Sequence, residues 1–272
     1  MMASAQLDEP IKQVIRRIVF CTGEPYAVSD EVVELLYAYL NTVVDRVTRE
    51  LGDARPDLTN ILLLVCHQPR VLTRVVDYFR ILAGGVGSKP VEGDTLAEIT
   101  DGSENAWNHL LELCAKLQIE VPDSETVDNP AMQNSPLAIG RQFRLARIDS
   151  KTMQMTVQEY LDFTKLRQTA TLLSLARPLR RSFWKWVFCR SSSQSQRDEL
   201  PADNSATEIS CSFAPEIRQG MKVLAHLLTY SILDVIDLAL FLRRKIGISL
   251  TSPLTPVEIK QSMQRFKPIP PL

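Results

Sequence analysis

The features of this chain that could support catalysis or bind a metal or phosphate are three histidines, five cysteines and one glycine-rich run. His67, His109 and His226 stand far apart, and none belongs to an H-E-x-x-H pattern. The cysteines show no C-x-x-C spacing, and the run GGVGSKP at 84–90 lacks the order of a phosphate-binding loop. We therefore expect no catalytic residue, no cofactor and no bound metal, and we predict that the chain is not an enzyme.

A second candidate is the aromatic and basic segment RRSFWKWVF at 180–188. Basic residues interleaved with aromatic ones can bind nucleic acid through phosphate contacts and base stacking. At helical spacing, however, Phe183, Trp184, Val187 and Phe188 are more simply explained as one face of a protein core. The residues that remain for contact with a partner or with DNA are Arg180, Arg181, Lys185 and Trp186.

Two carboxylates, Asp234 and Asp237, lie one helical turn apart within the apolar segment 223–242. Each would cost roughly 2.5–3.5 kcal/mol at the centre of a bilayer, so we predict a helix buried inside a protein and not a membrane span. Buried carboxylates need cationic partners. The candidate partners are Arg16, Arg17 and Arg46.

Composition and charge limit the class of protein. Hydrophobic residues make up 45% of the 272 residues and charged ones 23%, which is typical of a soluble globular protein, and ten glycines argue against an all-β fold. We find no secretory signal, so we expect reduced thiols in the cytosol or nucleus. Residues 84–140 hold 10 acidic and 2 basic side chains, whereas 141–190 hold 11 basic and 3 acidic ones. The two segments either neutralise each other or present a basic surface to nucleic acid or to an acidic partner.

The elements that must position these residues are helices. In the first part of the chain, apolar periodicity predicts a short helix at 8–20, which Asp8 could cap, with Pro10 in its first turn. Ser29 and Asp57 are suitable caps for the next two helices, and Gly52 is a suitable stop. The remaining predicted helices of this part are 29–51, 58–67 and 70–82.

The end of the chain repeats this order. A short amphipathic segment precedes a helix of about thirty residues at 215–245, Gly247 follows it, and a last short helix lies within 254–266. Thr255 and Glu258 form a capping box at the start of that last helix. A helix so short must dock on another element, and we expect it to be the third element of a second short–long–short unit. The segments 84–135 and 190–212 are expected to be polar linkers, with an isolated helix at 107–119.

This helix order, together with several short runs, resembles the Spt-three family, the histone-fold subunits of the SAGA transcriptional coactivator. It also resembles the related TBP-associated factors thirteen and eleven of TFIID. The matching runs include IKQVIRRIVFCTGEPYAVSDEVVELLYAYL, DLTNILLLVCHQPRVLTRVVDYF, YLDFTKLRQTATL, RSFWKWV, SILDVIDLALFLRR and LTPVEIKQSMQRF. His67 and Gln68 depart from the charged pair that the family has before its proline.

The resemblance implies an all-α fold with two histone-fold halves that pair within one chain. The first fold would cover 8–83 and the second 156–267, with a polar insertion at 190–212. Between them, 84–155 would be a connector, first acidic and then basic, and partly disordered. The residues expected to pair the two halves are Val33, Leu36, Leu40 and Val44 in the first and Leu224, Leu228, Ile232 and Val235 in the second.

In function, the resemblance implies a nuclear, non-enzymatic coactivator subunit that binds TBP and helps deliver it to promoters. Its partners would be TBP and other histone-fold subunits of a SAGA-type complex, with weak or indirect contact to DNA and none to membranes. The alternative is a histone-fold protein that grips duplex backbone through the basic segment 141–190. Steeply salt-dependent DNA affinity would distinguish that alternative.

Overall fold

The protein is built from helices. The computed structural model describes residues 2–25, 27–52, 54–83, 103–122, 135–174, 187, 215–249 and 251–265, and this part of the chain contains no strand, which confirms the all-α class. The helices are α1 Met2–Phe20, α2 Asp30–Leu51, α3 Leu58–Val65, α4 Pro69–Ala83, α6 Ser103–Lys116, α8 Pro136–Thr152, α9 Val157–Thr169, α11 Pro215–Lys245 and α12 Pro256–Arg265, with a short 3-10 turn, η2, at Leu172–Ser174.

Most predicted helix boundaries are confirmed by local geometry. The Asp57 carboxylate accepts a hydrogen bond from the backbone N–H of Asn60 and so caps α3. Gly52 and Gly247 follow α2 and α11 with positive φ angles of 55° and 72°, a conformation that L side chains rarely adopt. These signals are local, which is why the sequence reveals them.

Two start signals were wrong in detail. Helix α1 begins at Met2, so Pro10 lies inside it and Asp8 is not its cap. Asp8 instead accepts a hydrogen bond from the Tyr37 hydroxyl (2.6 Å), which ties α1 to α2. Ser29 does precede α2, but its side chain makes no capping hydrogen bond.

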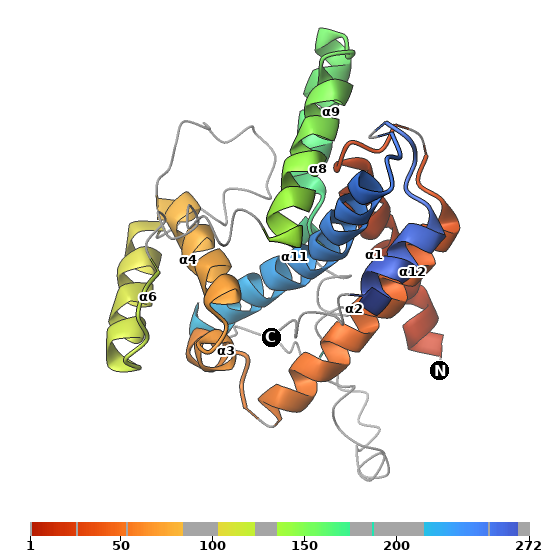
Figure 1. Ribbon diagram of the computed structural model, residues 1–272. Helices are drawn as coiled ribbons and strands as arrows, with labels where there is room; N and C mark the ends of the chain where they lie inside the picture. The colour runs from red at the N-terminus through yellow and green to blue at the C-terminus, as the bar shows by residue number, and fades with distance from the viewer. Residues whose placement is uncertain are drawn as a thin grey trace.

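Helix α11 runs through the middle of the molecule, and α1, α2, α3, α4, α8 and α12 all pack against it (Figure 1). By length and composition alone its span Ile217–Lys245 could cross a membrane, but 78% of its most apolar stretch is buried within the fold. Burial on most sides explains its nearly continuous apolar sequence. The helix therefore serves as the centre of the protein core.

Two helices fall within the range that we assigned to the connector, so that range is not a linker throughout. Helix α6, close to the expected isolated helix at 107–119, packs on α4 rather than standing alone. Helix α8 packs along α11 and, with α9, forms a hairpin that projects from the rest of the molecule (Figure 1). The polar composition of the region hid α8, because this helix buries only a narrow face.

Candidate functional site

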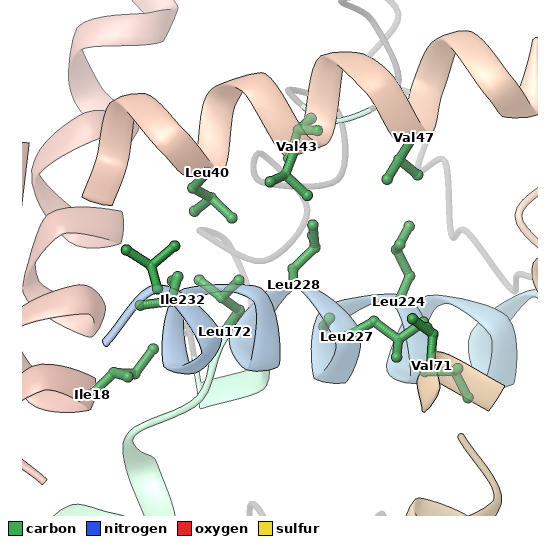
Figure 2. Packing of buried hydrophobic residues seen from close by; sticks show 14 of the residues in the cluster. Ile18, Leu40, Val43, Val47, Val71, Leu172, Leu224, Leu227, Leu228 and Ile232 are labelled. Carbon is green, nitrogen blue, oxygen red and sulfur yellow. The ribbon is translucent and has the colours of Figure 1, made fainter. Parts of the chain in front are cut away.

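The two apolar stripes expected to pair lie in one core, where α2 packs on α11. Leu40, Val43 and Val47 of α2 point toward Leu224 and Leu228 of α11 (Figure 2), and each is at most 2% exposed. Burying a side chain of this size stabilises the fold by about 1.5–3 kcal/mol. All eight of the expected residues are buried, namely Val33, Leu36, Leu40, Val44, Leu224, Leu228, Ile232 and Val235.

Each of the short helices α3 and α12 packs on a long helix from the other end of the chain. Helix α3 packs on α11 as well as α2, and α12 packs on α2 as well as α11. Gly220 permits the first of these contacts, because a Cβ atom there would lie 2.3 Å from the carbonyl oxygen of Pro56. The two ends of the chain therefore complete each other's core.

Asp234 binds two arginines of α4. Arg74 donates to both carboxylate oxygens, at 2.8 and 2.5 Å, and Arg70 makes a longer contact of 3.3 Å. The two-pronged Arg74 pair is the geometry in which guanidinium and carboxylate bind most strongly. It fastens α4 to the middle of α11.

The partners that we expected for this carboxylate were wrong. Arg16 pairs instead with Glu9 and Asp30, and Arg46 pairs with Glu50 on its own helix. Arg17 is exposed. These three arginines lie away from the apolar faces of α1 and α2, which point toward the core, so they cannot reach α11.

Asp237, one turn further along α11, binds a residue of α8. Arg144 donates to both of its oxygens, at 2.7 and 3.2 Å. A Cβ atom on the neighbouring Gly140 would lie 1.9 Å from the Asp237 carbonyl oxygen, so α8 and α11 touch backbone to backbone. One signal could have predicted this helix: Arg144, Arg147 and Lys151 recur every three or four residues, which places them on one helical face.

A second ionic cluster joins segments from both ends of the chain. Glu24, in the link between α1 and α2, accepts hydrogen bonds from Arg147 (3.1 Å) and from the backbone N–H of Leu254 (3.0 Å). Arg243 donates to both oxygens of Glu258, each at 2.7 Å. The side chains of both arginines are only 1% exposed. Breaking such a pair leaves an uncompensated charge in the core, which is strongly destabilising.

The capping box of α12 is part of this cluster. The Glu258 carboxylate accepts from the backbone N–H and the hydroxyl of Thr255, both at 2.8 Å, as predicted for the capping box. Burial alone would raise the pKa of Glu258, but the hydrogen bonds from Arg243 and Thr255 lower that pKa below its ordinary value. The last helix is thus held by its own cap and by a buried ion pair with α11.

Lys151 holds the projecting hairpin to α1. Its ammonium donates to the Glu24 carbonyl oxygen at 2.6 Å, lies 3.2 Å from the centre of the Phe20 ring and 5.3 Å from that of Phe163. The two rings meet edge to face at 6.1 Å. Burial lowers the pKa of Lys151 to about 8.

The described part of the basic segment 141–190, which is 141–174 with Val187, does not form a continuous cationic surface. Arg144, Arg147 and Lys151 are turned inward toward the partners named above, which leaves Arg141, Lys165 and Arg167 exposed. Binding to a duplex backbone depends on how many phosphates the cationic side chains neutralise, and these three offer few such contacts. The rest of the segment, with the candidate contact residues Arg180, Arg181, Lys185 and Trp186, lies outside the described residues, although Val187 is described and is fully buried.

The histidines occupy unrelated places. His67 is exposed, His109 lies 3.2 Å from Gln219, and the ring of His226 stands between those of Tyr78 and Tyr230, at 4.7 and 4.6 Å. Burial, with a smaller contribution from Arg74, lowers the pKa of His226 to about 4. Among the described residues no cluster of three metal-ligating side chains occurs.

In the described part of the chain, two sets of buried ion pairs thus cross the apolar core. The sequence predicted the apolar stripes and the caps at Asp57 and Thr255, but it did not predict α8 or the arginines that pair with Asp234 and Asp237. No family model, curated protein or solved structure matches this chain.

Proposed function

We propose that this chain is a non-enzymatic transcription coactivator subunit of the nucleus, in which two histone folds pair within one polypeptide. It would stand beside other histone-fold subunits in a SAGA-type complex, bind TBP and promote its delivery to promoters. The assembly and the TBP contact are carried by the resemblance to the Spt-three family. The pairing has support of its own in the geometry.

The observation that carries the proposal is the exchange of short helices between two long ones. Helices α2 and α11 have 22 and 31 residues, whereas α3 and α12 have 8 and 10. Each short helix packs on the long helix of the other end of the chain. In a paired histone fold, the two long helices share one core and neither half can bury its apolar surface alone, so such an exchange is expected.

The test is recovery of partners from nuclease-treated nuclear extract with the tagged full-length chain. Gly220→Leu removes the close approach of α11 to the start of α3 and should abolish recovery, because the added side chain has no space. Ala146→Leu enlarges an exposed position of α8 and serves as the matched control.

We expect the wild-type chain and the Ala146 variant to recover TBP together with SAGA subunits. Recovery of neither by the wild-type chain would contradict the proposal. If the purified chain instead bound duplex DNA with an affinity that fell steeply as salt rose, the alternative of a DNA-gripping histone-fold protein would replace it.

A further inference from the structure

Helices α4 and α8 each bring arginines to one of two neighbouring aspartates on α11. Arg74 occupies both oxygens of Asp234, and Arg144 occupies both oxygens of Asp237. Each of these pairs is charge-neutral, and neither carboxylate has an oxygen left without a donor. Any further arginine at this junction therefore carries charge that the junction itself does not compensate.

Arg70 is the first such arginine. Its one contact to Asp234, at 3.3 Å, goes to the oxygen that already accepts from Arg74 at 2.5 Å. Its side chain is 35% exposed, against 18% for Arg74. Burial lowers the pKa of Arg70, Asp234 opposes this, and the neighbouring Arg74 and Arg141 lower it further. The guanidinium of Arg70 thus reaches solvent beside two other cations.

Arg141 is the second. It follows Gly140, the point at which α8 touches the backbone of Asp237, and it precedes Arg144 by one helical turn. Its side chain is exposed and makes no hydrogen bond or ion pair with any residue that the structure describes. Because Asp234 and Asp237 are one turn apart, α11 brings Arg70 of α4 and Arg141 of α8 to the same junction.

We propose that Arg70 and Arg141 form a docking surface for an acidic segment of a partner protein, with a carboxylate of that segment held between α4 and α8. Guanidinium groups bind carboxylates through paired, charge-assisted hydrogen bonds, and two of them can clamp one side chain. Nucleic acid fits less well, since two cations are too few to grip a duplex backbone. The surface would exist whether or not the chain binds TBP, because α4, α8 and α11 alone build it.

The experiment measures fluorescence anisotropy of a fluorescein-labelled hexaglutamate peptide titrated with the full-length chain at near-physiological salt. The variant Arg70→Ala/Arg141→Ala should weaken binding roughly tenfold or more, because each guanidinium contributes charge-assisted hydrogen bonds. The matched control is Arg49→Ala/Arg55→Ala, which removes the same charge from two exposed arginines near the end of α2. It should weaken binding by less than about twofold, as expected for a distant surface charge.

Two further variants separate recognition from folding and from simple charge. Arg141→Ala alone removes an exposed side chain without a described partner, so it should unfold at the wild-type temperature and still weaken binding severalfold. Arg70→Lys/Arg141→Lys keeps the charge but loses the paired hydrogen bonds, and should bind with intermediate affinity.

Equal losses in the Arg70/Arg141 and Arg49/Arg55 variants, or no binding by the wild-type chain, would overturn the proposal. Full affinity in the lysine variant would overturn the clamp geometry. If a short DNA duplex bound more tightly than hexaglutamate, with the same dependence on Arg70 and Arg141, the surface would be a nucleic-acid site. That result would also overturn the proposal.

Discussion

Glu258 and Glu159 occupy the same local motif in opposite surroundings, and this contrast makes the energy of the buried pair measurable. Each is the last residue of a Thr-x-x-Glu capping box whose hydrogen bonds are formed. Glu159 is exposed and has no arginine partner among the described residues, whereas Glu258 is 6% exposed and pairs with Arg243. The substitutions Glu258→Gln and Glu159→Gln therefore differ in the ion pair and not in the cap.

The expected loss follows from the geometry of Arg243. Removing one partner of a buried ion pair costs about 3–5 kcal/mol because the other charge stays uncompensated. Arg243 also donates to the carbonyl oxygens of Ser252 (2.5 Å) and Pro253 (2.7 Å), which soften that loss. We therefore expect Glu258→Gln to lower the free energy of unfolding by about 3 kcal/mol, and Glu159→Gln by less than about 1 kcal/mol.

The assay is thermal unfolding followed by circular dichroism. At about 2 °C per kcal/mol for a chain of this size, Tm should fall by about 6 °C for Glu258→Gln and by less than about 2 °C for Glu159→Gln. Because the pKa of Glu258 is lowered in the folded state, its stabilising effect is present above the ordinary carboxyl pKa and is lost as pH falls through the lowered one. The Tm difference between wild type and Glu258→Gln should therefore hold from neutral pH to about pH 5 and shrink below it. Equal shifts for the two variants at neutral pH would refute the reasoning.

Three other outcomes are expected from the buried contacts. His226 has a pKa of about 4 when folded and about 6.5 when unfolded, so lowering the pH from about 7 to 5 should reduce the free energy of unfolding of the wild type by about 2 kcal/mol. The variant His226→Phe should not show this loss, and the change in Tm between the two pH values measures the difference. Gly140→Ala should lower the Tm measured by thermal unfolding, because the added Cβ would collide with the Asp237 carbonyl. A Gly→Ala substitution at an unhindered helical position instead stabilises a protein by about 0.4–1 kcal/mol. Leu228→Ala should cost about 2–5 kcal/mol in denaturant unfolding, against less than about 0.5 kcal/mol for Val257→Ala, since Leu228 is 1% and Val257 60% exposed.

The parts of the fold that local sequence determines could be predicted. Asp57 caps α3 through a hydrogen bond to a residue three positions away, and Gly247 ends α11 through its own backbone conformation. The apolar stripes of α2 and α11 could also be predicted, because burial of one helix face makes apolar residues recur with a period of 3.6 residues. Each of these signals spans only a few residues or one element.

The ionic contacts could not be predicted, because they join residues far apart in the chain. Asp234 meets Arg74 across 160 residues, and Glu24 meets Arg147 across 123. Many arginines compete for each carboxylate, and the choice depends on which helix the fold brings near. Helix α8 was missed for a related reason: it presents arginines to the core, and sequence periodicity identifies a buried face by its apolar residues.

These contacts also explain how α11 keeps its position among six neighbours. Apolar packing has little direction, so a helix of 31 residues could slide by one turn along its partners and still bury similar surface. A slide of one turn, about 5.4 Å, would take Asp234 from Arg74, Asp237 from Arg144 and Arg243 from Glu258 at once. Each separation would leave an uncompensated charge in the core, at a cost of about 3–5 kcal/mol. The three pairs fasten α11 to α4, α8 and α12 respectively, so they fix one register for the whole core, and with it the placement of the helices that carry Arg70 and Arg141.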